Sequence, residues 1–210
     1  MREVEWRVRQ FADQVYNDLL FSLGALKEMV DSLAGLPGRK ALVYVSDGFP
    51  MIAGEDLFYG LQQKFTDASV LTKLHDVDAS RRVNALASQA NANGIVFYSV
   101  DASGLRTPGS SSVLKGTASS PGMDAFIDSV YISNHQSPIR FLADKTGGFA
   151  IYNTNTVGPG LDRMAMDLGT YYSLGYAPAH SGDGRYHKIE VKLEERKDLR
   201  VRHREGYRDK

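Results

Sequence analysis

The chain has 210 residues, which is enough for one domain with a hydrophobic core of its own. Its 25 basic and 25 acidic residues give a formal net charge of zero, so no global field draws the chain to nucleic acid or to an anionic membrane. Cysteine is absent, which excludes disulfides, thiol catalysis and cysteine-based zinc sites but leaves the compartment undecided. No apolar run approaches the ~20 residues that cross a bilayer, so we expect a soluble chain without membrane insertion. The export signal of a periplasmic or extracellular parent would lie outside this sequence.

The first half of the chain alternates helical patterns with apolar strands. A stripe of apolar residues from Val4 to Leu33 recurs at helical spacing, and Leu36-Pro37-Gly38 ends it. Residues 41–45 are apolar on both faces, which predicts a parallel strand that is covered on both sides. The expected elements are a helix at 3–35, the strand at 41–45, a weak helix at 56–75, a helix at 80–92 capped by Asp78, and a strand at 95–100.

The second half begins with a segment rich in Gly, Ser, Thr and Pro, residues 104–122, which we expect to be a mobile loop. Ser137 and Pro138 have the order of a helix cap and a first helical residue, and they predict a helix that starts there. A strand at 149–152 and a helix around Leu161 to Leu168 follow. From residue 171 onward the period changes to alternation, which predicts antiparallel strands within 172–176, 189–193 and 199–201.

These elements predict an α/β fold with right-handed crossovers between its parallel strands. We expect residues 1–170 to form the α/β domain. Residues 171–210 are then antiparallel strands that extend the same domain or form a flap.

Polar residues follow each predicted parallel strand, at the edge where α/β proteins bind ligands. Ser46 and Asp47 follow the first strand, Asp101 and Ser103 the second, and Asn153 the third. We therefore expect Asp47, Asp101 and Asn153 to share one rim. Carboxylate and amide oxygens there could hold a cation or act as acid and base, but Asp and Ser are also ordinary turn formers at strand ends. Turn formation is the interpretation we favour.

Other catalytic patterns are missing from the sequence. It has no His-x-x-x-His, no His-Glu-x-x-His and no Gly-x-Ser-x-Gly, which argues against a zinc hydrolase and a serine hydrolase. Gly147-Gly148 and Gly158-Pro159-Gly160 lack the context of a phosphate-binding loop and are read as a helix cap and a turn.

Four blocks of the sequence, in order, resemble the von Willebrand factor type A-related domain, and are most similar to a bacterial branch often found in acidobacterial proteins. The blocks are "LPGRKALVYVSDGFP", "ALASQANANGIVFYSVDASGL", "LADKTGGFAIYNTN" and "YYSLGYAPA…GRYHKIEVKL…LRVRHREGY". The resemblance implies a Rossmann-like sheet between layers of helices. It also implies a divalent-cation site, known as MIDAS, through which such domains bind a carboxylate of a partner protein.

The sequence departs from the family pattern at that cation site. An Asp-x-Ser-x-Ser loop should follow a strand ahead of the first helix, and only Asp47, beside Ser46, has a counterpart in the pattern. The chain therefore resembles such a domain without its first strands, with a degenerate site that binds Mg²⁺ or Mn²⁺ weakly or not at all. The family implies a non-enzymatic interaction or adhesion module with a protein partner. A metal-assisted hydrolase that uses Asp47 and Asp101 remains the alternative. The missing strand also predicts a homodimer, through the exposed sheet edge or the first helix.

Overall fold

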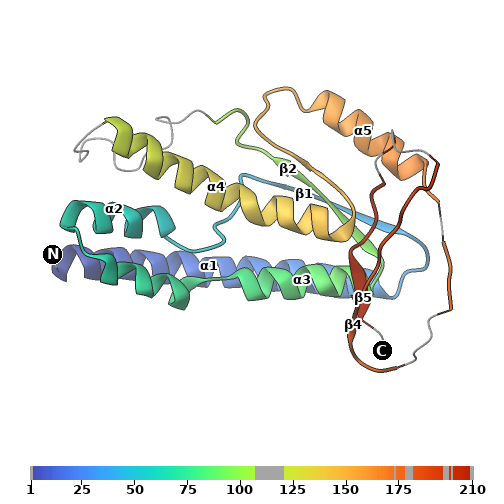
Figure 1. Ribbon diagram of the computed structural model, residues 1–210, viewed down its shortest axis with the longest axis horizontal. Coiled ribbons are helices and arrows are strands. Elements are labelled where there is room, and N and C mark those ends of the chain that lie inside the picture. The colour runs from blue at the N-terminus through green and yellow to red at the C-terminus, as the bar shows by residue number, and fades with distance from the viewer. Residues whose placement is uncertain are drawn as a thin grey trace.

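The computed structural model describes residues 2–106, 121–172, 174–177, 182–195, 199 and 201–208. It has a three-stranded parallel sheet with strand order β1-β2-β3, together with a separate two-stranded antiparallel sheet of β4 and β5 (Figure 1). The mixed α/β class is therefore confirmed. The elements in chain order are α1 (Arg2–Ala34), β1 (Lys40–Ser46), α2 (Glu55–Phe65), the 3₁₀ helix η1 (Ala68–Val77), α3 (Ser80–Ala92), β2 (Ile95–Asp101), α4 (Pro121–Thr146), β3 (Ala150–Ile151), α5 (Gly158–Gly169), β4 (Tyr186–Lys188) and β5 (Gly206–Arg208).

The first half of the chain follows the sequence pattern closely. α1, α3, β1 and β2 lie where periodicity places them, and the weak helical region divides into α2 and η1. Asp78 was predicted to cap α3, but the N-cap residue is Ala79, which makes no side-chain capping bond. Asp78 lies one residue earlier and accepts a hydrogen bond from the backbone N–H of Ser80 at 2.7 Å. In Figure 1, α1 runs along most of the length of the molecule, beside α3.

Helices cover the two faces of the sheet unequally. On one face, Ile95 and Phe97 of β2 pack with buried residues of α1, α3 and α4 in the main core. On the other face, Tyr98 and Val100 pack against Met164 of α5 in a smaller cluster. The central strand β2 is therefore buried on both faces, as a parallel strand between helix layers should be.

β3 pairs with β2 over only two residues. Beyond the end of β3, a side chain in place of a strand accepts the next hydrogen bond from β2. The backbone N–H of Ser99 donates to the carbonyl of Phe149, whereas the N–H of Phe97 donates to Oγ1 of Thr146 at 2.8 Å. Thr146 in turn donates to the carbonyl of Leu142 on α4. A buried threonine hydroxyl thus links the central strand to the helix that covers it.

The start of α4 corrects the prediction of a helix beginning at Ser137. The helix begins at Pro121, and Pro138 lies inside it. A proline in a helix leaves the carbonyl four residues earlier without its N–H donor. Here that carbonyl belongs to Asn134, and it accepts the backbone N–H of Met51 at 3.1 Å. A contact from outside the helix therefore compensates for the proline, and no local sequence pattern reports it. The predicted loop at 104–122 lies mostly outside the described residues.

The C-terminal strands differ from the predicted ones. β4 and β5 are antiparallel, as expected, but they form a sheet of their own and do not pair with β1, β2 or β3. The described residues of 172–176, 189–193 and 199–201 contain no strand. Alternation indicates a surface that suits a strand, but a strand also needs a partner to pair with.

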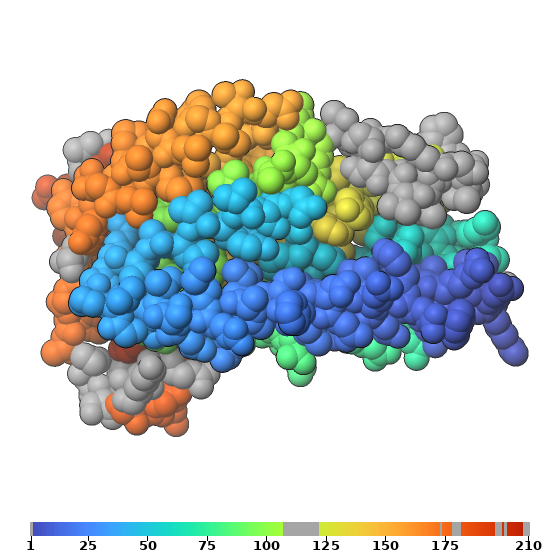
Figure 2. Space-filling model, turned by 180° about the vertical axis from the view of Figure 1, so that it is seen from behind, coloured from blue at the N-terminus to red at the C-terminus, as the bar shows by residue number. Residues whose placement is uncertain are grey.

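The exposure of β1 contradicts the prediction that this strand is covered on both faces. Its residues alternate between half-buried and exposed, with Val43 46% and Val45 61% exposed. β1 is exposed because it lies at the edge of the sheet. The face that carries its exposed side chains lies beside α5, and α5 does not cover it (Figure 2). Separately, none of the described helices is long and apolar enough to cross a membrane.

Replacement of Thr146 tests the link between β2 and α4. In Thr146→Val the buried N–H of Phe97 has no acceptor, so we expect a loss of about 1–3 kcal/mol in the free energy of unfolding. Thr146→Ser keeps the hydroxyl and is the matched control, with a smaller loss expected. Urea denaturation of the three proteins measures this, and a Thr146→Val variant as stable as wild type would contradict it.

Candidate functional site

The carboxyl ends of the parallel strands meet at one rim, and two side chains connect the residues there. Gln136 of α4 donates from Nε2 to Oδ2 of Asp101 and to Oδ1 of Asn153, each at 2.8 Å. Arg106 donates from Nε to Oγ of Ser103 at 2.6 Å and from a terminal nitrogen to the backbone carbonyl of Asp47. The predicted rim residues Asp47, Asp101, Ser103 and Asn153 are therefore brought together.

Asp101 is the buried centre of this rim. Its side chain has no exposed surface, and a guanidinium nitrogen of Arg106, 9% exposed, lies 3.6 Å from Oδ1. Oδ1 also accepts the backbone N–H and the hydroxyl of Ser103, while Oδ2 accepts the amide of Gln136. Both carboxylate oxygens are thus occupied by donors, and a positive charge neutralises the buried negative one.

Ser46 and Asp47 form a turn. Oγ of Ser46 accepts the backbone N–H of Gly48 at 3.1 Å. Gly48 has φ of 89°, and a Cβ at this position would lie 2.5 Å from the carbonyl oxygen of His135, so glycine is required. Asp47 contributes its backbone carbonyl to Arg106. This geometry is the turn that the sequence favoured over a metal ligand pair.

The rim does not fit a divalent cation. A divalent cation needs oxygen ligands that are free to coordinate it. The two carboxylate oxygens of Asp101 already accept hydrogen bonds, one from Ser103 and the other from Gln136. A guanidinium beside Asp101 would also repel a metal ion there. In the described part of the chain, no group of three or more His, Asp or Glu side chains is placed to hold a metal. The arrangement of the rim instead holds three strand ends and α4 together.

Arg106, Gln136 and His135 were not identified from the sequence. Nδ1 of His135 donates to the backbone carbonyl of Tyr131 at 2.9 Å, and the centroids of the two rings lie 4.0 Å apart. Burial lowers the pKa of His135, and the nearby Arg106 lowers it further. The only sequence signal that could have identified Arg106 as a rim residue is its position five residues after the end of β2. Gln136 lies on a part of α4 that was not predicted as helix.

A second candidate site is the open edge of β1. Lys40 N–H donates to Gly94 and the Ser46 carbonyl accepts Ala102 N–H, so the even-numbered residues of β1 direct their backbone groups toward β2. The odd-numbered residues then direct theirs outward, where no described strand pairs with them. These are Ala41, Val43 and Val45, which also have the exposed side chains of this strand. Figure 2 shows this part of the chain at the surface between α1 and α5.

Comparison of the chain with protein-family models, with curated proteins and with solved structures found no match.

Arg106→Ala tests whether the guanidinium holds the rim. Removal of one member of a buried ion pair leaves the other charge without compensation, and we expect a loss of about 3 kcal/mol in the free energy of unfolding. The control is Lys27→Ala, which breaks an exposed ion pair with Asp31 and should cost less than about 1 kcal/mol. Adding Asp101→Asn to Arg106→Ala should recover part of the loss. Equal effects of Arg106→Ala and Lys27→Ala in denaturant titrations would refute this account of the rim.

Proposed function

We propose that this chain is a non-enzymatic protein-interaction module of the von Willebrand factor A type, in which β1 pairs with a strand of a partner protein. The observation that carries the proposal is the coincidence of two properties in Ala41, Val43 and Val45. Their backbone groups are directed to the open edge, and their side chains form the exposed apolar face. An added strand would satisfy both at once.

The chemistry of the edge supports strand addition over a general apolar contact. Natural proteins blunt an open edge with charged side chains, proline or a bulge. Here the outward-directed residues are an alanine and two valines, and β1 pairs in continuous register with β2 from Lys40 to Ser46. Such an edge is a template for another strand.

The state of the strand-end rim favours interaction over catalysis. The metal-assisted hydrolase would use Asp47 and Asp101, but Asp101 is buried and both its oxygens accept hydrogen bonds. A substrate or a water could contact these oxygens only by displacing the hydrogen-bond donors that already occupy them. In this proposal the rim stabilises the domain, and contact with the partner occurs at β1.

The partner that we propose is a second copy of the chain. Antiparallel pairing of two β1 strands about a two-fold axis places Val43 opposite Val43 of the second copy, and Ala41 opposite Val45. Such an interface is self-complementary, because the same surface serves on both sides. The two three-stranded sheets would become one sheet of six strands, with the valines of both copies side by side on one face.

Substitution of the edge valines tests the proposed function. Val43→Lys with Val45→Lys places two charges at the interface, and we expect the dimer dissociation constant to rise by at least tenfold, since like charges that face each other across strands repel. Light scattering and sedimentation velocity over a range of protein concentrations measure this constant.

The matched control is Phe21→Lys, at a residue of α1 that is 82% exposed, and it should leave the dissociation constant unchanged. Thermal unfolding of each variant confirms that it is folded. If wild-type protein stays monomeric up to high micromolar concentration, or if the edge variant dimerises as well as wild type, the proposal is wrong.

A further inference from the structure

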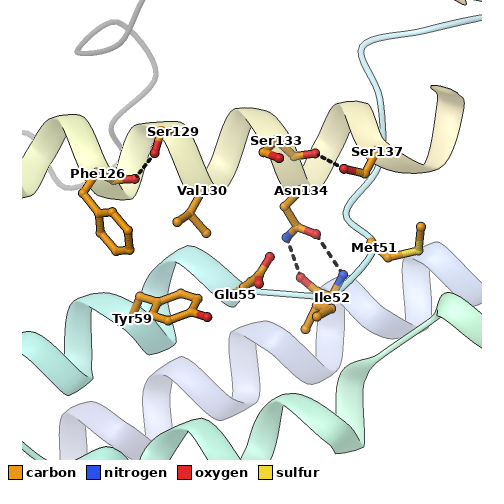
Figure 3. A pocket seen from close by; sticks show the side chains of 10 residues that line it. All are labelled: Met51, Ile52, Glu55, Tyr59, Phe126, Ser129, Val130, Ser133, Asn134 and Ser137. Atoms are coloured by element: carbon orange, nitrogen blue, oxygen red, sulfur yellow. Dashed lines mark hydrogen bonds between the residues drawn. The ribbon is translucent and has the colours of Figure 1, made fainter. Parts of the chain in front are cut away.

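A groove lies between α2 and α4, on different elements from the β1 edge. Its volume is about 500 Å³, and Figure 3 shows the residues that line it. Phe126, Val130 and Asn134 are spaced four residues apart on α4, so they form one row along the helix. Across the groove, Glu55 and Tyr59 are similarly spaced on α2. The walls are therefore two rows of side chains on regular helices.

Hydrogen bonds between Asn134 and the backbone of Met51 and Ile52 hold the floor of the groove. Nδ2 of Asn134 donates to the carbonyl of Ile52 at 2.7 Å, and Oδ1 of Asn134 accepts the N–H of Ile52 at 3.0 Å. The N–H of Met51 donates to the backbone carbonyl of Asn134 that Pro138 leaves open. The segment before α2 is thus fixed to α4 at three points. A site with a fixed floor is already formed before a ligand arrives, as in most small-molecule sites.

Glu55 gives the groove a negative charge. It is the one charged residue among those that line the groove, and no described Lys, Arg or His forms an ion pair with it. Burial raises the pKa of the Glu55 carboxyl, and the nearby carboxylates of Asp56 and Asp78 raise it further. Figure 3 shows the carboxyl group directed into the space between the two helices. A positive group bound there would remove the cost of a half-buried, uncompensated charge.

Aromatic rings close one end of the groove. Tyr59 and Phe126 meet edge to face, with ring centroids 5.8 Å apart and planes at 87°. An ammonium group is attracted both to a carboxylate and to the face of an aromatic ring, and the apolar body attached to it would lie against Val130. Charge and apolar lining together therefore select a cation that has an apolar body.

From these features we propose that the groove is a binding site for a small organic ammonium ligand, with Glu55 as the counter-ion of the ammonium group. The size of the groove favours a small molecule over a protein. A volume of about 500 Å³ lies within the range of small-molecule sites, ~300–1,000 Å³. A stable protein interface, by contrast, buries about 800 Å² on each partner.

A pair of matched probes tests the proposal. The 2-phenylethylammonium ion and 2-phenylethanol have nearly the same shape, and only the first has a charge. Titration of the whole chain at neutral pH, followed by amide chemical shifts in NMR, should show saturable shifts at Glu55, Tyr59, Phe126 and Val130 with the ammonium probe. The alcohol should bind at least tenfold more weakly.

Two variants assign the roles of the residues. Glu55→Gln keeps the shape of the side chain and should weaken binding of the ammonium probe about tenfold, while leaving binding of the alcohol unchanged. The control is Glu28→Gln, which removes an exposed carboxylate on α1 and should change neither. The thermal midpoint of Glu55→Gln should equal or exceed that of wild type, because the lost charge is an unfavourable one.

Three results would overturn the proposal: equal affinity for the two probes, no saturable shifts in the groove, or equal effects of Glu55→Gln and Glu28→Gln. Each would show that Glu55 is not a counter-ion for an ammonium ligand. None depends on whether β1 forms a dimer, so this site and the proposed function can fail separately.

Discussion

The parallel pairing of β1 with β2 is the constraint on which the other features of the structure depend. The pairing assigns the backbone groups of alternate β1 residues to β2 and leaves those of Ala41, Val43 and Val45 at the edge. The same alternation directs Leu42 and Tyr44 into the main core and the valines to the opposite face. At the far end of the strands, the pairing brings Ser46 beside Asp101, which starts the rim that Arg106 and Gln136 complete.

The position of α5 explains why the valines stay exposed. Asp167, near the end of α5, accepts the Tyr98 hydroxyl and forms ion pairs with Arg39 and Arg202. Arg39 also donates to the Tyr98 hydroxyl and to the Asp167 carbonyl, both at 3.1 Å. Burial, followed by the hydrogen bond to Asp167, raises the pKa of Tyr98 to about 12, so the hydroxyl stays protonated and remains a donor at neutral pH. This cluster fixes α5 over the central strand. In the described residues, nothing comparable holds a helix over the face of β1 that carries Val43 and Val45.

Local patterns in the sequence were sufficient for some of these features and not for others. Periodicity located α1, α3, β1, β2 and α5, because a regular stripe or an apolar run marks each of them in the sequence. In α5 only Met164 of that stripe is buried. The strand-end rule placed Asp47, Asp101 and Asn153 together, since parallel strands end at one edge. The extent of α4 was missed, because a contact from Met51 compensates for Pro138. The burial of β1 was also misjudged, since an apolar strand at an edge and one at the centre have the same composition, and only the topology separates them. Gln136, Arg106 and the groove beside Glu55 depend on contacts between distant segments, which no spacing in the sequence reports.

Disulfide trapping at Val43 tests the central claim, that the open edge of β1 pairs with a second copy, most directly. The chain has no cysteine, so each variant carries a single thiol. In the antiparallel pairing about Val43, the two Cα atoms are about 5.5 Å apart, within the range that a disulfide spans. The account predicts that Val43→Cys forms a covalent dimer rapidly under mild oxidation, and that Val45→Cys and Phe21→Cys do so much more slowly. Cross-linking of Val43→Cys no faster than that of Phe21→Cys would contradict it.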